Sequence, residues 1–477
     1  MCLYSHYWNE KCDSLHIIGA KNVYIHVLDT DMKFERSIYK SLKIWQKDGK
    51  KKPLLLMGAR QIGKTTLLKT FGTDEYEDFI YLNFEKQRDI HAFFTGNKDP
   101  ETILENISLL YGKEIEEESC LIILDEIQEC KDALIALKYF AEERPGIHLV
   151  GAGSLLGLSI GNDRSFPVGK VQFLHMYPLT FEEYLQAADS KLYKSYLHYL
   201  ATEELQPLQE AFFTPLKALY KEYTLFGGMP EVASEYLVTR DVEKAQAIQD
   251  QILLAYSLDF VKHAQATTST KIQQVWESIP SQLAKENKKF VYKLIKSGAR
   301  AREYEVAIQW LIQAGLLYKI SNVSTPAIPV KTYENISVYK LYVFESGLLV
   351  RLAGLDPKVF IHGDLLFTEF RGALAENQVS QALAATMHEL PCYWTSDGKA
   401  EIDFIISKKN YCIPVEVKSG TATKAKSLSV YKEKYQPELR IRVSNKNLSL
   451  DGDLLNVPLF YAERISELVG KVVGGQK

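Results

Sequence analysis

The amino-acid sequence predicts an α/β fold that begins with a parallel sheet covered by helices. Short apolar runs of strand length recur at residues 53–57, 79–84, 121–124 and 147–152. Helical stretches separate these runs, as expected when crossover helices join parallel strands. The third run leads directly into two acidic residues, which is typical of a strand that ends at a ligand site. We therefore expect a doubly wound parallel sheet over roughly residues 32–190.

Length and composition limit what else the chain can be. Its 477 residues are enough for about three domains of roughly 150 residues. The 57 basic and 60 acidic side chains nearly balance, so no global field favours nucleic acid or a membrane surface. The six cysteines lack metal-ligand spacing, which predicts reduced thiols in a cytoplasmic protein. No apolar run approaches the ~18 residues of a membrane span, so we expect no membrane partner.

The first 31 residues show little periodicity, whereas an amphipathic helix pattern, FERSIYKSLKIWQ, begins two residues after Met32. We expect residues 1–31 to be a leader that is either disordered or a product of gene-start assignment, with Met32 as the native start.

The first strand leads into a phosphate-loop signature. Residues 58–66 read GARQIGKTT, with an apolar strand before them and a helical run after them. Two glycines let the backbone amides turn inward toward a phosphate at the helix N-terminus. Lys64 would reach the β- and γ-phosphates of ATP, and Thr65 would bind Mg²⁺. A chance glycine-rich turn is the alternative, which the flanking strand and helix disfavour. The predicted ATP contacts are Gly58, Ala59, Arg60, Gln61, Ile62, Gly63, Lys64, Thr65 and Thr66.

An acid pair completes the predicted nucleotide site. In CLIILDEIQE, residues 120–129, Asp125 would hold Mg²⁺ and Glu126 would act as general base toward water. A core strand running into a solvated acidic turn is the alternative. The pair favours hydrolysis over phosphoryl transfer to a small substrate. Ser154, after the fourth strand, would either sense the γ-phosphate or cap the next helix, and both interpretations stay open.

The middle of the chain changes character twice. Residues 191–265 are mostly helical and predict a lid or bundle, interrupted by LFGGMPEV at 225–232. Residues 266–335 are compatible with a winged helix. Basic residues mark the start of its predicted DNA-reading helix. A packing module with a solvated charged face is the alternative. The basic residues are Lys293, Lys296, Arg300 and Arg302.

Residues 401–420, EIDFIISKKNYCIPVEVKSG, predict a β-hairpin around the turn SKKN. The register that pairs apolar residues also sets Asp403 opposite Glu416, with Lys418 on the same face. The predicted apolar pairs are Ile402 with Val417, Phe404 with Val415, and Ile406 with Ile413.

These polar residues suit metal-dependent phosphodiester cleavage. Asp403 and Glu416 would hold one or two Mg²⁺ ions, and Lys418 would orient or deprotonate the attacking water. Glu376, on a helix at 374–383, would add a third carboxylate. A salt-bridged, solvent-facing hairpin is the alternative. The pattern therefore indicates a nuclease-like site and leaves cleavage itself open.

Taken together, the motifs resemble a bacterial and archaeal family of AAA-type ATPases with a C-terminal domain of unknown function related to restriction-endonuclease-like nucleases. The resemblance runs from Met32 to about residue 445. It implies a P-loop ATPase core at 32–190, a winged helix, and a nuclease-like α/β domain at 336–470. Its motifs are GARQIGKTTLL, LIILDEIQE, FPVGKVQFLHMYPLTFEEYL, LFGGMPEV, KLYVFESGLL, AEIDFII and IPVEVKSG.

The resemblance also implies roles for single residues. It places nucleotide contacts on the phosphate loop and on Asp125 and Glu126. Two positions depart from the family pattern: Lys170 stands where many members have arginine, and Glu345 where relatives commonly have aspartate. The implied nuclease-like positions are Glu376, Asp403, Glu416 and Lys418.

The leading functional hypothesis is a Mg²⁺-dependent ATP hydrolase coupled to a winged helix and a nuclease-like domain that acts on DNA. The alternative is an ATP-dependent regulatory switch whose inactive nuclease-like domain binds another protein. A small-molecule kinase fits poorly, because the acid pair suits water activation and two further domains follow. A homo-oligomer and a separate protein partner both remain open.

Overall fold

The computed structural model describes residues 32–474 except 97, 155, 158–168, 203, 286, 359–367, 388, 397–399, 409 and 421–425. The expectation for the leader, residues 1–31, lies outside the described residues. Of the helices in the described part, none combines the length and hydropathy needed to cross a lipid bilayer.

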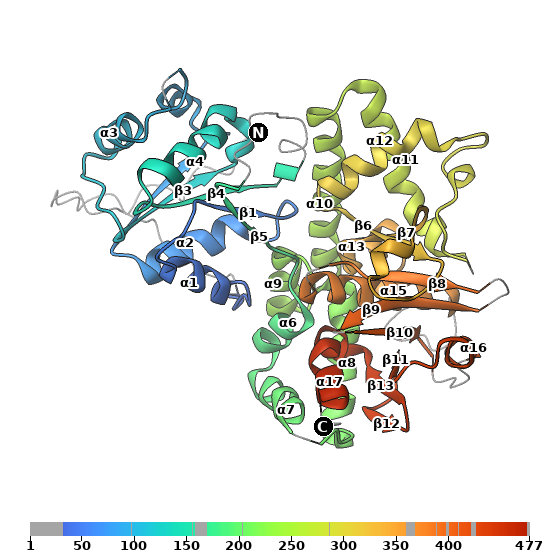
Figure 1. The fold of residues 1–477 in the computed structure, drawn as a ribbon. Coiled ribbons are helices and arrows are strands. Elements are labelled where there is room, and N and C mark those ends of the chain that lie inside the picture. The colour runs from blue at the N-terminus through green and yellow to red at the C-terminus, as the bar shows by residue number, and fades with distance from the viewer. Residues whose placement is uncertain are drawn as a thin grey trace, which may run out of the picture.

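The N-terminal part is a five-stranded parallel sheet in the order β2-β3-β4-β1-β5. This confirms the predicted parallel sheet and adds one strand, β5, that the apolar pattern did not reveal. Helices α1 and α2 cover one face, and α3 and α4 cover the other (Figure 1). The elements are β1 (Leu54–Met57), β2 (Asp78–Asn83), β3 (Cys120–Asp125), β4 (His148–Gly153), β5 (Gln172–His175), α1 (Tyr39–Lys47), α2 (Lys64–Glu75), α3 (Pro100–Tyr111) and α4 (Lys131–Glu143).

Alternating burial explains the two faces. Leu54 and Leu56 pack with α1 and α2, whereas Leu55 packs with α3 and α4, because successive strand residues point to opposite sides. All three are fully buried.

Helices fill the middle of the chain, as the sequence pattern suggested. They are α6 (Phe181–Ala188), α7 (Ser190–Ala201), α8 (Glu210–Phe226), α9 (Pro230–Thr239) and α10 (Val242–His263). In Figure 1, α10 stands between the parallel sheet and the C-terminal half. The N-terminus of α6 is tied to the far end of the chain, because the buried carboxylate of Glu463 accepts the backbone N–H groups of Phe181 and Glu182.

The C-terminal half is built on one eight-stranded sheet in the order β12-β13-β11-β10-β9-β8-β6-β7. Two helices, α11 (Ala266–Leu283) and α12 (Ala301–Gln313), precede its first strands, β6 (Leu317–Val323) and β7 (Glu334–Val343). Because β6 pairs with both β7 and β8, the sheet joins the proposed winged helix to the proposed nuclease-like domain. The proposed boundary at residues 335 and 336 falls inside β7.

The remaining elements complete this half. The strands are β8 (Cys392–Thr395), β9 (Glu401–Lys408), β10 (Tyr411–Lys418), β11 (Arg440–Ser444), β12 (Ser449–Asp451) and β13 (Leu454–Pro458). The helices are α13 (Ser346–Leu352), α15 (Thr368–Thr386), α16 (Lys426–Tyr435) and α17 (Ile465–Gly474).

The β9–β10 hairpin has the predicted register from Phe404 to the turn, whereas the predicted Ile402–Val417 and Asp403–Glu416 pairs lie beyond the end of the ladder. Phe404 pairs with Val415, and the ladder continues to the turn. On the other side of Phe404, the Asp403 carboxylate accepts the Val417 N–H at 2.8 Å. The Asp403 side chain therefore hydrogen-bonds to β10 next to Glu416, the residue that was predicted to lie opposite it.

Candidate functional site

The phosphate loop connects β1 to α2 and has the backbone that an anion site needs. Gly58, Gln61 and Gly63 have positive φ angles of 151°, 62° and 93°. A Cβ atom on Gly58 would lie 2.3 Å from the backbone carbonyl oxygen of Met176, so only glycine fits. The loop ends where α2 begins at Lys64, which sets the positive end of a helix dipole beside it.

Lys64 lies over this loop. Its ammonium group donates hydrogen bonds to the carbonyl oxygens of Gly58 at 2.9 Å and Ala59 at 2.7 Å. Burial lowers the pKa of Lys64 to about 8, although Glu126 and Asp125 act in the opposite direction. A bound phosphate would add negative charge and favour the charged ammonium.

Thr65 and Asp125 meet at the carboxyl end of β3. The Thr65 hydroxyl donates to the Asp125 carboxylate at 2.8 Å, and the Tyr81 hydroxyl donates to the same oxygen at 2.6 Å. Hydroxyl and carboxylate oxygens are the ligands that Mg²⁺ prefers. The two residues predicted to bind Mg²⁺ are therefore adjacent, and their donor atoms fit that ion.

Glu126 follows β3 in a left-handed backbone conformation, with φ of 49°. Such strain in a residue other than glycine is often found at functional sites. The Gln128 side-chain amide donates to the Glu126 carboxylate at 2.6 Å and fixes its orientation.

Ser154 lies at the end of β4 and is only 5% exposed. Among the described residues its hydroxyl has no hydrogen-bond partner. It lines a cavity of about 10 Å³ together with Arg60 and residues of α10 and α12. A cavity of this size has room for about one water molecule beside the Ser154 hydroxyl.

Helix α10 contacts the phosphate loop directly, which the sequence did not predict. The Arg60 guanidinium pairs with Asp259 of α10. The Tyr256 hydroxyl donates to the Arg60 carbonyl oxygen at 2.8 Å. Lys262, one turn further along α10, pairs with Glu85 at 2.7 Å. Three contacts therefore join the loop region to the helix between the two halves of the molecule.

Arg36 supports the loop from the other side and was also missed. Its guanidinium donates to the carbonyl oxygens of Ile62 at 2.9 Å and Tyr177 at 2.6 Å, and pairs with Glu183 at 2.9 Å. Nothing in the amphipathic pattern of residues 34–46 distinguishes this arginine from a surface residue.

The four residues predicted for the nuclease-like site also converge. Glu376 comes from α15, Asp403 from β9, and Glu416 and Lys418 from β10. Lys418 pairs with Glu416 at 2.9 Å. Glu376 and Asp403 each lie 3.8 Å from the ammonium group of a fifth residue, Lys340.

Lys340 belongs to β7 and was not predicted to lie here. It is fully buried and also bonds the Glu401 carboxylate. A second lysine, Lys288, pairs with Glu376 at 2.7 Å. Among the described residues, no group of three or more His, Cys, Asp or Glu side chains is arranged to hold a metal ion.

Burial and neighbouring charges shift the pKa values in this cluster. Burial, together with the negative charge of Glu376, raises the pKa of Asp403 to about 8. Burial alone would lower the pKa of Lys340, but the surrounding carboxylates raise it above its ordinary value. The pKa of Glu376 is lowered, because Lys340 and Lys288 outweigh its burial.

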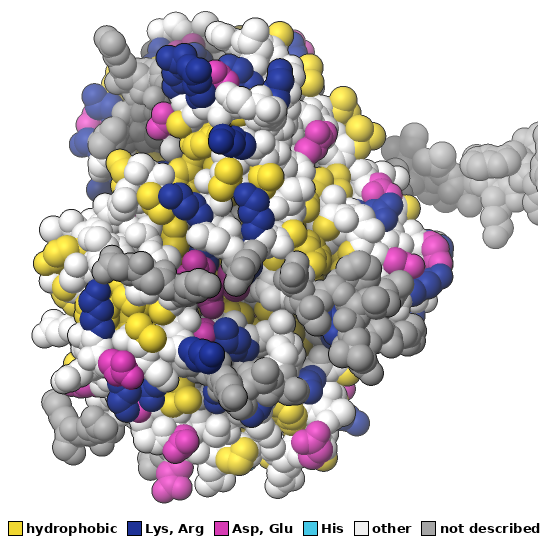
Figure 2. All heavy atoms as spheres, turned by 90° about the vertical axis from the view of Figure 1, so that its right-hand side faces the viewer, with side chains coloured by type: hydrophobic (Ala, Val, Ile, Leu, Met, Phe, Trp, Pro, Cys, Tyr) yellow, Lys and Arg dark blue, Asp and Glu magenta, His cyan; other side chains and the backbone are white. Residues whose placement is uncertain are grey.

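The basic residues proposed for DNA contact lie at the start of α12. Arg300 and Arg302 are exposed, as are Lys293 and Lys296 just before the helix. The side of the molecule shown in Figure 2 has acidic side chains in a central recess, with basic side chains above and below them.

The two departures from the family pattern have clear partners. Lys170 forms an ion pair with Glu142 at 2.8 Å and is exposed. Glu345 is buried, caps α13, and accepts the Gly228 N–H at 3.1 Å. This last bond joins two of the quoted motifs, LFGGMPEV and KLYVFESGLL.

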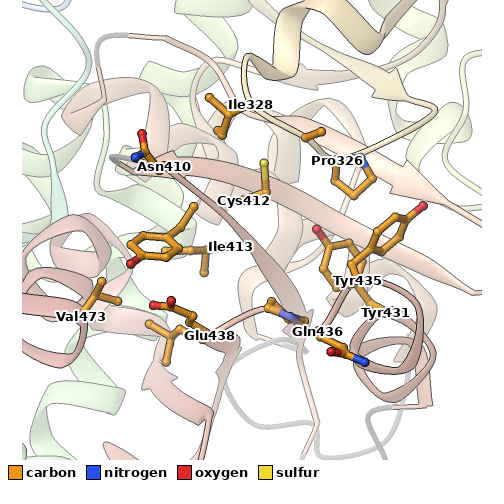
Figure 3. Close-up of a pocket in the computed structure, with 14 residues that line it drawn as sticks. Pro326, Ile328, Asn410, Cys412, Ile413, Tyr431, Tyr435, Gln436, Glu438 and Val473 are labelled. Carbon is orange, nitrogen blue, oxygen red and sulfur yellow. The ribbon is translucent and has the colours of Figure 1, made fainter. Parts of the chain in front are cut away.

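A cavity of about 330 Å³ lies away from both sites, at the turn end of the β9–β10 hairpin. Figure 3 shows Pro326, Tyr431 and Tyr435 on one side of it, and Glu438 and Val473 on the other. No pattern in the sequence indicated this cavity.

Comparisons with known proteins match three segments of the chain to domain families. Residues 50–185 match a family described as an AAA domain. Residues 217–359 match one domain of unknown function (DUF8612), and residues 371–460 match another (DUF4143). No curated protein matches the chain.

Several solved structures are similar at low identity. A Walker-type ATPase of Pyrococcus abyssi is 13% identical, covering 67% of this chain and 96% of its own, with a TM-score of 0.41. The ORC1 protein of Aeropyrum pernix, solved with DNA, is 16% identical, covering 68% and 91%, with a TM-score of 0.28. The RuvB Holliday-junction branch-migration motor of Thermotoga maritima is 17% identical, covering 60% and 89%, with a TM-score of 0.29.

The family match and the geometry of the loop agree with each other. The matched segment contains the phosphate loop, the Thr65–Asp125 pair and Glu126 at one edge of a parallel sheet. Residues 50–185 therefore form an AAA domain of the P-loop ATPase type.

Proposed function

We propose that this protein binds ATP with Mg²⁺ at the phosphate loop, hydrolyses it, and transmits its nucleotide state to the C-terminal half, which acts on DNA. The observation that carries the proposal is the meeting of Lys64, the Thr65–Asp125 pair and Glu126 in one AAA domain.

Each residue has a distinct task in the proposed hydrolysis. The backbone of residues 58–66 and the Lys64 ammonium hold the phosphates. Thr65 and Asp125 would hold Mg²⁺, which neutralises charge on the β- and γ-phosphates. Glu126 accepts a proton from water as the water oxygen attacks the γ-phosphorus, and the bond to the β-phosphate oxygen breaks. The products are ADP and phosphate.

Helix α10 is the proposed route from nucleotide to C-terminal half. Its C-terminal end contacts Arg60 and Glu85 beside the phosphate loop. Nearer its start, Asp250 pairs with Arg351 of α13 at 2.6 Å. The proposal needs two conformations, one with α10 held against the phosphate loop and one with it released. A ligand shifts the equilibrium between them only if it binds the two differently. ATP would do so by competing for the groups that now hold α10 against the loop.

The C-terminal half has two candidate functions. The meeting of Glu376, Asp403, Glu416 and Lys418 supports a nuclease-like site, with the exposed basic residues before α12 as a DNA contact. The alternative is a switch that does not cleave and acts through a protein partner or a second copy of the chain. The presence of Lys340 among the carboxylates favours this alternative.

ATP turnover, measured with and without plasmid DNA, tests the first part. We expect Lys64→Ala to lose ATP binding, and Glu126→Gln to keep binding but lose about 10²–10⁴-fold in turnover. Lys170→Ala is the matched control, because Lys170 is an exposed lysine of the same domain outside the site. Turnover of Lys64→Ala at the wild-type rate would refute the site.

DNA cleavage tests the second part. Plasmid and linear DNA are incubated with Mg²⁺ or Mn²⁺, with and without ATP, beside Asp403→Ala. Cleavage that Asp403→Ala abolishes would establish the nuclease, and cleavage that persists would exclude this site. No cleavage under any condition would favour the switch.

A further inference from the structure

The C-terminal acidic cluster holds almost as much positive as negative charge. Its four carboxylates are Glu376, Glu401, Asp403 and Glu416, and its three ammonium groups are Lys288, Lys340 and Lys418. With all four carboxyl groups ionised, the three ammonium groups leave a net charge of −1, and a protonated Asp403 leaves none. A site that binds two divalent cations needs a surplus of several negative charges, which this cluster does not have.

Lys340 takes the central position. Its side chain is 0% exposed, and its ammonium lies 3.8 Å from both Glu376 and Asp403 while it bonds Glu401. An unpaired ammonium could not be buried so deeply, because its desolvation would cost several kcal/mol. The three carboxyl groups are therefore what keeps Lys340 here, and Lys340 in turn holds them close together.

Three carboxylate oxygens of Glu376 and Asp403 also have partners of their own, whereas one buried oxygen of Glu416 has none among the described residues. In Glu376, one oxygen pairs with Lys288 at 2.7 Å and the other accepts the Tyr342 hydroxyl at 3.0 Å. One oxygen of Asp403 accepts the Val417 N–H. Mg²⁺ takes its oxygen ligands at about 2.0–2.1 Å in a nearly octahedral arrangement. An ammonium group and a hydroxyl occupy the directions from which such an ion would approach Glu376.

The two lysines differ in how firmly they are held. Lys340 extends from the middle of β7, whereas Lys288 lies on the segment between α11 and the short helix at Tyr292–Leu294. The side chain of Lys288 is 12% exposed. Movement of that segment would free one oxygen of Glu376 without disturbing the sheet.

We propose that Lys340 and Lys288 are internal counter-ions that close this cluster to divalent cations in the conformation described here. The residues present do not fit the metal that the nuclease-like resemblance implies, and two lysines supply the charge that the metal would supply. This inference concerns the C-terminal site of the proposed function and does not depend on ATP hydrolysis.

Mn²⁺ binding to nucleotide-free protein tests the proposal. All variants carry Lys64→Ala, so ATP hydrolysis plays no part in the result. Free Mn²⁺ is measured by electron paramagnetic resonance, and melting temperatures are recorded with and without Mn²⁺. The test variant is Lys288→Met/Lys340→Met. Lys319→Met is the matched control, because Lys319 lies on β6 over the Tyr339 ring rather than among carboxylates.

In the parent protein and in Lys319→Met, adding Asp403→Asn should leave Mn²⁺ binding unchanged, because neither protein has a Mn²⁺ site at Asp403. The double variant should melt at a lower temperature, bind one Mn²⁺ per chain, and regain roughly 3–10 °C when Mn²⁺ is added at about 100 times its Kd. Adding Asp403→Asn should abolish this binding.

Two results would overturn the proposal. One is an Asp403-dependent Mn²⁺ site in the parent protein. The other is a double variant that melts cooperatively but binds no Mn²⁺. If the double variant does not fold, Lys288→Met alone decides, because it leaves Lys340 in the sheet. An Asp403-dependent Mn²⁺ site in Lys288→Met that the parent lacks supports the proposal, and its absence refutes it.

Discussion

Asp259→Asn should destabilise the protein measurably through the phosphate loop. The Asp259 side chain is 8% exposed and pairs with Arg60, which is 25% exposed. The substitution leaves the guanidinium with Glu85 at 3.7 Å as its remaining carboxylate neighbour. Breaking a buried ion pair costs about 3–5 kcal/mol, and a surface pair contributes about 0–1 kcal/mol. Because Arg60 is a quarter exposed, we expect Asp259→Asn to lower the free energy of unfolding by about 1–3 kcal/mol.

This loss corresponds to a fall in melting temperature of roughly 2–10 °C, since each kcal/mol shifts a domain by a few degrees. Thermal unfolding of nucleotide-free protein, followed by circular dichroism, measures it. Lys262→Met is the matched control on the same turn of α10, because the Lys262–Glu85 pair is 46% and 40% exposed. Lys262→Met should lower the free energy of unfolding by less than about 1 kcal/mol. Equal shifts in the two variants would refute the reasoning.

Three further outcomes follow from the geometry. Gly58→Ala should abolish ATP binding in isothermal titration, because its Cβ would lie 2.3 Å from the backbone oxygen of Met176. Gly49→Ala is the control and should bind ATP normally, because its Cβ would have no atom within 4 Å. Gly228→Ala should lower the unfolding free energy in urea by about 1–3 kcal/mol, since its Cβ would lie 2.3 Å from a Glu345 oxygen; an unchanged midpoint would contradict this. Burial raises the pKa of Glu463 from 4.5 to about 8, so its neutral form stabilises the fold at low pH and that contribution is lost as pH rises toward 8. Thermal unfolding from pH 5 to 8 should therefore show wild type losing stability relative to Glu463→Gln, and a constant difference would refute this.

Local sequence patterns predicted the parts of the fold that local geometry determines. The strands around 54–57 and 120–125 were recognisable, because buried parallel strands are short apolar runs. The β9–β10 register followed from alternation around a short turn, as the Phe404–Val415 pair confirms. Strand β5 was missed, because QFLH has only two apolar residues and its burial alternates.

Long-range contacts were beyond such patterns. Lys340 is 36 residues before Glu376 and 63 before Asp403 in the chain, and only the packing of α15 against the eight-stranded sheet brings the three together. Arg60 and Asp259 are separated by 199 positions. A lysine or an aspartate in an amphipathic pattern is normally predicted to face solvent. Whether it is buried depends on which distant element packs against it, and a local pattern does not contain that information.

The Glu463 carboxylate that accepts the Phe181 N–H stands 282 positions further along the chain. During translation at roughly 5–20 residues per second, α6 must wait roughly 15–60 s for that partner to be synthesised. The contact between α6 and Glu463 therefore forms only after residue 463 has been synthesised. In products that stop short of it, Thr180 still caps α6, but the Phe181 and Glu182 N–H groups lack their carboxylate partner.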